Sequence, residues 1–97
     1  MNTMNKQEKP KWFKGAWYNT GDTVTNPFTG EQYELTGPEL SMYDFIKGAE
    51  YTLAVNAQNS GDFYIEDPSM VKLQKEMIKG LDWFRSQNSK AYMTLLD

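Results

Sequence analysis

The sequence predicts a small α+β domain in which a β-hairpin packs on an antiparallel two-helix hairpin with a short C-terminal helical turn. The hairpin becomes three-stranded if Trp17 extends the pairing. Three observations carry this prediction. Apolar and polar residues alternate around a turn sequence in residues 22–35, and apolar residues recur at helical spacing over residues 36–57 and again from residue 67 to about residue 88. A chain of 97 residues suffices for one domain of this kind.

The hairpin is predicted from its turn. The expected strands are Thr23–Thr25 and Gln32–Leu35, joined by residues 26–30 with the sequence Asn-Pro-Phe-Thr-Gly. Pro27 presets φ at the second position of a turn, Asn26 can hydrogen-bond forward into it, and Gly30 can adopt positive φ. Because an isolated hairpin is only marginally stable in water, we expect it to pack on the second face of the helix that follows.

The stretch Thr36 to Ala57 is the predicted central helix. Thr36 and Glu39 have the spacing of a capping box, and Pro38 suits the first helical turn. The small residues Gly48 and Ala49 are expected to allow a neighbouring helix to approach closely. Apolar residues lie nearly all the way round, so we expect a partner helix on one side and the hairpin or another chain on the other. The main apolar face consists of Met42, Phe45, Ile46, Ala49 and Leu53.

A second helix is predicted to begin at Asp67-Pro68, with Asp67 as N-cap and Pro68 at the first helical position. Trp83 projects away from the apolar stripe of this helix, so we expect the last segment of the chain, or a partner, to cover it. The helix should end near Asn88, with Ser89 capping a short final turn. The inner stripe consists of Met70, Leu73, Met77, Leu81 and Phe84, widened by Val71 and Ile78.

The domain limits follow from composition. Residues 1–9 are expected to form a disordered N-terminal arm and residues 10–97 the single domain. Gln58 to Glu66 is predicted to be a loop. Phe63 and Tyr64 make this loop too apolar to lie free in water, so they should either pack into the core or form part of a binding surface.

Composition excludes several function classes. The absence of Cys and His excludes disulfides, thiolate and histidine zinc sites, and imidazole catalysis. The sequence contains no apolar run long enough to predict a membrane span, and the N-terminus lacks the apolar core of a signal peptide.

Carboxylates are the only classical catalytic groups present in number, and no pattern brings two of them together across a cleft. Asp62, Glu66 and Asp67 are close in sequence but lack calcium-loop spacing, so capping and solvation explain them better than a metal does. No phosphate-binding loop or nucleophile elbow occurs. We therefore expect a protein that is not an enzyme and binds no metal or cofactor.

The charge distribution leaves nucleic-acid binding open. The net charge is −3, but residues 1–14 contain four lysines and one glutamate, whereas the remainder contains six basic and twelve acidic groups. Lysines bind phosphates and rings stack on bases, so the stretch Lys11 to Tyr18 could bind nucleic acid through Lys9, Lys11, Trp12 and Lys14. The acidic body and the single arginine weigh against this. The alternative is that Trp12 and Trp17 cover an open edge of the core.

Surplus aromatic residues favour a protein partner. The chain has three Trp, six Tyr and five Phe, and such rings are enriched at interface cores. Packing inside the domain is the competing interpretation, because a small core uses every large ring it can bury. The candidates are Trp12, Trp17, Tyr43, Tyr51, Phe63, Tyr64 and Trp83.

Several short motifs are familiar. They are N-P-F-T-G-E at 26–31, E-L-T at 34–36, Y-D-F-I-K-G-A-E at 43–50, D-W-F-R at 82–85 and K-A-Y-M-T-L-L-D at 90–97. With these motifs the chain resembles a group of short, uncharacterised proteins of tailed bacteriophages, especially those infecting marine bacteria. The resemblance implies a phage product that acts in the bacterial cytoplasm or in the virion, and it implies no activity or binding residues.

Together these observations predict a non-enzymatic accessory protein of phage type that binds a host or phage protein through an aromatic-rich surface, with self-association as a further use of that surface. Two alternatives remain open. One is a structural component of the virion, and the other is a nucleic-acid-binding accessory protein that uses the basic aromatic stretch Lys11 to Tyr18.

Overall fold

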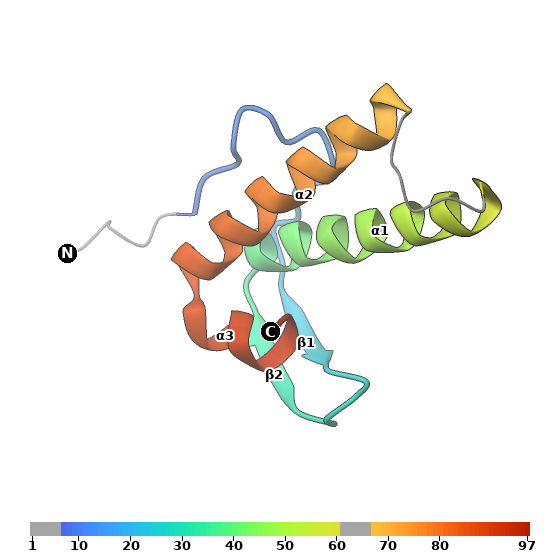
Figure 1. Cartoon of the computed structure of the whole chain (residues 1–97). Helices are drawn as coiled ribbons and strands as arrows, with labels where there is room; N and C mark the ends of the chain where they lie inside the picture. Colours follow the sequence, from blue (N-terminus) through green and yellow to red (C-terminus); the bar gives the residue numbers. More distant parts are fainter. Residues whose placement is uncertain (1–6, 61–66) are drawn as a thin grey trace.

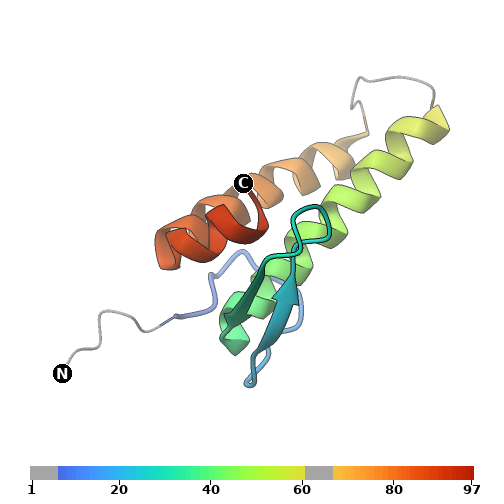
Figure 2. The ribbon, with the colours of Figure 1, turned by 90° about the horizontal axis from the view of Figure 1, so that it is seen from below.

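The computed structural model describes residues 7–60 and 67–97, which contain a two-stranded sheet and three helices (Figure 1). Helices α1 and α2 form an antiparallel pair, and α3 lies with the hairpin near the start of α1 (Figures 1 and 2). The predicted α+β class and helical hairpin are confirmed. The predictions for residues 1–6, and for the loop residues Phe63 and Tyr64, lie outside the described residues. The elements are β1 (Asp22–Thr25), β2 (Gln32–Leu35), α1 (Gly37–Ser60), α2 (Pro68–Gln87) and α3 (Ser89–Leu95).

The hairpin forms as predicted. β1 and β2 are antiparallel, with Asp22 opposite Leu35 and Val24 opposite Tyr33. In the turn, the Asn26 carbonyl oxygen accepts a hydrogen bond from the Gly30 amide, and Gly30 has a φ of 79°. The proposed third strand at Trp17 is wrong for the described residues, because their sheet has two strands.

The hairpin packs mainly on α3 and less on α1, which corrects the prediction that the second face of the central helix would cover it. The Asn26 side-chain amide donates to the carbonyl oxygen of Thr94 in α3 at 2.9 Å. The Tyr33 hydroxyl donates to Asn88 Oδ1, just before α3, at 3.4 Å. The hairpin therefore leaves part of α1 uncovered, and Tyr51 on this helix is 72% exposed.

The capping box of α1 is confirmed. The Thr36 amide donates to Glu39 Oε1 at 3.0 Å, and the Glu39 amide donates to Thr36 Oγ1 at 3.2 Å. The helix continues past the predicted end at Ala57 to Ser60. Gln7, the first described residue of the N-terminal arm, joins this cap, because its side chain donates to Glu39 Oε2 at 2.8 Å and accepts from the Thr36 hydroxyl at 2.6 Å.

Close approach of α1 and α2 occurs at Gly80. A Cβ atom there would lie 3.1 Å from Met42 Sδ and 3.3 Å from Ile46 Cγ1, and both of these side chains are fully buried. The prediction of close approach at Gly48 is wrong, because Gly48 is exposed and a Cβ atom on it would meet nothing within 4 Å. Gly48 lies off the apolar face that α2 covers.

The ends of α2 and α3 are fixed by side-chain caps. Asp67 accepts from the Ser69 amide at 2.9 Å, as predicted. At the other end, the Asn88 amide donates to the Phe84 carbonyl, and Asn88 Oδ1 accepts from the Ala91 amide at 3.1 Å. α2 therefore ends near Asn88 as predicted, whereas the N-cap of α3 is Asn88 rather than the predicted Ser89. Ile78, expected on the widened stripe of α2, is 50% exposed.

The same substitution at two glycines tests the helix packing. Gly80→Leu should lower the free energy of unfolding by about 1–3 kcal/mol or more, because the side chain overpacks against Met42 and Ile46. Gly48→Leu should be neutral or stabilising by up to about 1 kcal/mol, because leucine favours the helix and meets no neighbour. Chemical denaturation of both variants measures the difference, and equal destabilisation would contradict the packing.

Candidate protein-binding surface

Five rings form one aromatic cluster that joins the N-terminal segment to α1 and α2. Phe13 is its centre, with ring centroids 5.8 Å from Trp12, 5.4 Å from Phe45 and 5.2 Å from Trp17. Trp17 in turn lies 5.7 Å from Trp83, edge to face. Contacts of this geometry stabilise by about 0.5–1.5 kcal/mol each beyond burial of area. Three of the predicted partner-binding rings, Trp12, Trp17 and Trp83, are therefore in contact with other rings of the same chain.

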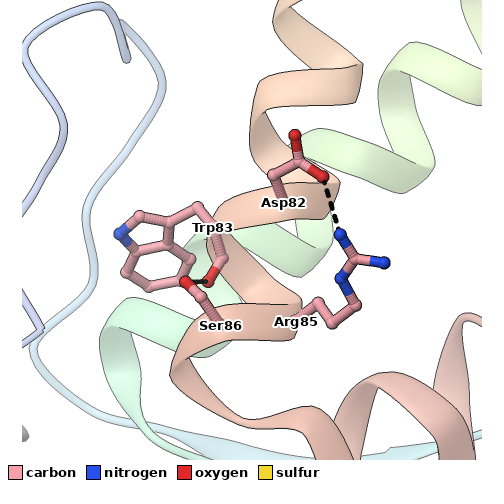
Figure 3. Close-up of polar contacts among 4 residues, drawn as sticks. All are labelled: Asp82, Trp83, Arg85 and Ser86. Carbon is pink, nitrogen blue, oxygen red and sulfur yellow. Dashed lines mark hydrogen bonds and ion pairs between the residues drawn. The ribbon is translucent and has the colours of Figure 1, made fainter.

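Trp83 is packed by the N-terminal segment rather than by the C-terminal segment assigned to it from sequence. Figure 3 shows its indole projecting from α2 toward the pale-blue N-terminal trace, on the opposite side of the helix from Arg85. The ring packed against it belongs to Trp17. Arg85 pairs with Asp82 at 3.3 Å on the exposed side. The surplus tryptophan of α2 is thus part of the domain core.

Among the described residues, two other predicted rings, Tyr43 and Tyr51, do not belong to this cluster. Tyr43 is half-buried against the core, and Tyr51 is largely exposed farther along α1. Phe63 and Tyr64 lie outside the described residues. Of the five candidates that lie among the described residues, the structure therefore brings together three, and it places those three where they stabilise the fold.

The proposed nucleic-acid residues separate into two groups. Lys9, Lys11 and Lys14 are exposed, as phosphate contacts would require. Trp12 is half-buried between Phe13 and Phe45, with centroid distances of 5.8 and 5.9 Å. The indole is thus partly covered, which reduces the area on which a base could stack.

A shallow groove of about 620 Å³ lies between the segment 17–22 and the first turns of α1. Its backbone is held by the Tyr18 amide, which donates to the buried Ser41 Oγ at 2.6 Å. Glycine is required at two contacts, because a Cβ atom on Gly21 would overlap the Leu35 carbonyl and one on Gly37 would overlap that of Tyr18. The groove is lined by Trp17, Tyr18, Asn19, Thr20, Gly21, Asp22, Leu40 and Asp44.

The chemistry of the groove is acidic and aromatic. Asp22 and Asp44 supply two carboxylates, Trp17 and Leu40 supply apolar surface, and no lining residue is basic. The Tyr18 hydroxyl donates to Asp44 Oδ2 at 3.0 Å. This hydrogen bond, together with the negative charge of Asp44, raises the pKa of Tyr18 above its usual value.

The groove residues come from a stretch of the sequence that is acidic throughout. Residues 15–46 contain five carboxylates and no lysine or arginine. Glu39 is buried, 3% exposed, in the α1 cap, whereas the other four are exposed. We call these four residues, Asp22, Glu31, Glu34 and Asp44, the acidic sector. Basic residues are instead carried by the N-terminal segment, by Lys47 in α1 and by α2 and α3.

The sequence singled out Trp17 and Tyr18 of the groove, but not its carboxylates Asp22 and Asp44, nor the exposed ring of Phe28 on the hairpin. Phe28 was assigned only to the turn, yet it is 91% exposed there. A large ring in the middle of a turn, where small and polar residues dominate, is the signal that could have identified it. The pairing of Asp22 with Asp44 in one groove had no such signal, because the two residues are far apart in sequence and meet only through the packing of segment 17–22.

Among residues 7–60 and 67–97, no group of three or more acidic residues is placed to hold a metal ion. No helix in this part of the chain is long and apolar enough to cross a membrane. No protein-family model, curated protein or solved structure matches the chain.

The Tyr18–Asp44 contact predicts a shift in titration. Asp44→Asn should lower the pKa of Tyr18 toward its usual value, because ionised Tyr18 would no longer face a carboxylate. Since the folded-state pKa is raised, the contact stabilises the fold below the unfolded tyrosine pKa, and this contribution disappears as pH rises through the folded pKa. NMR titration measures the pKa of Tyr18 in both proteins, and the Tyr18→Phe variant identifies the Tyr18 resonance. An unchanged Tyr18 titration in Asp44→Asn would disprove the coupling.

Proposed function

We propose that this protein is a non-enzymatic accessory protein that binds a protein partner through its acidic sector, and that the groove receives a basic side chain of that partner. The observation that supports this most directly is the composition of the groove. Asp22 and Asp44 offer carboxylates beside the Trp17 ring, with no basic residue in the lining. Carboxylates form charge-assisted hydrogen bonds with arginine and lysine, and aromatic rings attract cations through their faces.

The setting of these carboxylates supports an external partner. Two exposed carboxylates outside the acidic sector pair with basic residues of their own helix: Glu50 with Lys47 at 3.1 Å and Asp82 with Arg85 at 3.3 Å. Residues 15–46, which carry the acidic sector, contain no lysine or arginine, and Lys47, which lies one helical turn after Asp44, pairs with Glu50. A field of one sign accelerates association with an oppositely charged surface and disfavours partners of like charge. The partner surface in this proposal is therefore basic.

The setting in which this protein acts follows from the resemblance to phage proteins. We propose that it binds its partner, a host or phage protein, in the bacterial cytoplasm, with the virion as the alternative location. A structural role in the virion would require repeated contacts between copies, and the exposed Tyr51 on the uncovered part of α1 is the observation that favours self-association.

Nucleic-acid binding is a second candidate, favoured by the exposed lysines of the N-terminal segment. Binding of single-stranded DNA that weakens steeply with salt and requires Lys9, Lys11 and Lys14 would support it. The acidic sector repels phosphate, so this candidate uses a different face of the molecule from the first.

Binding of a hexa-arginine peptide, measured by calorimetry at low salt, tests the leading proposal. The paired variant Asp22→Asn with Asp44→Asn should weaken binding at least about tenfold, which corresponds to about 1.4 kcal/mol. A matched control, Glu76→Gln with Asp82→Asn, removes the same charge from α2. It should change peptide binding by less than about twofold, because both residues lie outside the acidic sector and an isolated surface charge contributes little to binding.

Two results would contradict the proposal. The first is equal weakening by both paired variants, which would mean that only net charge matters. The second is the absence of binding to the unmodified protein. A hexa-glutamate peptide serves as the sign control and should not bind.

A further inference from the structure

Phe28 is the most exposed large apolar side chain among the described residues of the domain, at 91%. Other rings are packed where the fold allows it, as in the cluster around Phe13, whose central ring is 3% exposed. An isolated exposed ring is common on protein surfaces, so exposure alone assigns no role to Phe28. The conformation of its turn and the charge around it add two independent observations.

The turn that carries Phe28 is locked before any partner binds. The Phe28 amide donates to Asn26 Oδ1 at 2.8 Å, and the Asn26 amide donates to the Glu31 carbonyl at 2.8 Å. Asn26 is itself 7% exposed and is tied to Thr94 of α3. Pro27 restricts φ at the next position, which narrows the turn further. The turn therefore loses little backbone entropy when a partner binds Phe28, which is the advantage of a preorganised anchor.

The charge around the hairpin decides between classes of partner. Glu31 and Glu34 are exposed on the hairpin, and Asp22 is exposed at its base. Nucleic acids and anionic membranes also accept aromatic side chains, but these carboxylates repel both. A protein surface that is apolar at its centre and basic at its rim complements both the ring and the carboxylates.

We infer that Phe28 is an anchor residue that binds an apolar surface bordered by lysine or arginine side chains on a protein partner. This inference rests on the proposed function, because it assigns the apolar contact to the same acidic sector that the proposal assigns to a basic partner. The ring supplies the buried contact, and the carboxylates of the hairpin supply orientation and rate of association.

The probe is a designed 14-residue amphipathic peptide of leucine and lysine, whose helix has an apolar stripe bordered by lysines. A companion peptide replaces every leucine by glutamine and keeps the charge. Fluorescence anisotropy of each labelled peptide, titrated with the full-length protein, gives the two dissociation constants. The leucine peptide should bind the unmodified protein more tightly than the glutamine peptide.

Phe28→Ala should weaken binding of the leucine peptide at least tenfold and leave binding of the glutamine peptide unchanged, because only the ring contact is lost. Phe28→Leu should recover part of the loss. The matched control is Met93→Ala, which truncates another exposed apolar side chain, 67% exposed on α3, and should change neither constant. Phe28→Ala should keep its Tm within about 3 °C, because the ring makes few contacts in the fold.

Each other outcome counts against the inference. Equal effects of Phe28→Ala and Met93→Ala, or no effect of Phe28→Ala, would overturn it. Phe28-dependent binding to anionic vesicles, or a Phe28-dependent dimer in light scattering, would assign the ring to a different occupant. If hexa-arginine binding still depends on Asp22 and Asp44, the proposed function survives such a failure. If neither peptide class binds the unmodified protein, both fail together.

Discussion

Much of this structure depends on one buried carboxylate, that of Glu39. Its Oε1 accepts from the Thr36 amide at 3.0 Å, and its Oε2 accepts from the side-chain amides of Gln7 at 2.8 Å and Asn88 at 3.1 Å. A carboxylate that is only 3% exposed is tolerated because these donors replace its lost water. The three donors come from the N-terminal segment, the start of α1 and the corner between α2 and α3, so one group fixes the relative positions of all three.

The hydrogen bonds to Glu39 also position the candidate protein-binding surface. Asn88, held by Glu39, caps α3, and α3 holds the hairpin through Thr94 and Asn26. On the other side, the N-terminal segment runs from Gln7 into the aromatic cluster, which positions Trp17 and the segment that builds the groove. The large rings of this segment are thereby used in the core, while carboxylates are left on the outside. This division is the physical reason that recognition in our proposal is acidic, with a single exposed ring as its apolar contact.

The features predicted correctly from sequence are those set by residues close together in the chain. The capping box of Thr36 and Glu39, the Asp67 cap and the positive φ of Gly30 each depend on a few neighbours. The predictions that failed needed distant contacts: the close helix approach at Gly48, which segment covers Trp83, and which helix supports the hairpin. The candidate surface was the least predictable part, because aromatic residues signal both cores and interfaces. Only the packing distinguishes the buried Phe13 from the exposed Phe28.

The most direct test of the central role of Glu39 is a double-mutant cycle between Glu39→Gln and Asn88→Ala, measured by chemical denaturation. A glutamine cannot accept from both the Thr36 amide and the Asn88 side chain, so Glu39→Gln should lower the free energy of unfolding by about 1.5–3 kcal/mol. The account predicts a coupling energy of at least about 1 kcal/mol between the two changes, as for residues joined by a hydrogen bond. Additive effects within about 0.3 kcal/mol would contradict it and would mean that Glu39 and the α2–α3 corner are not coupled.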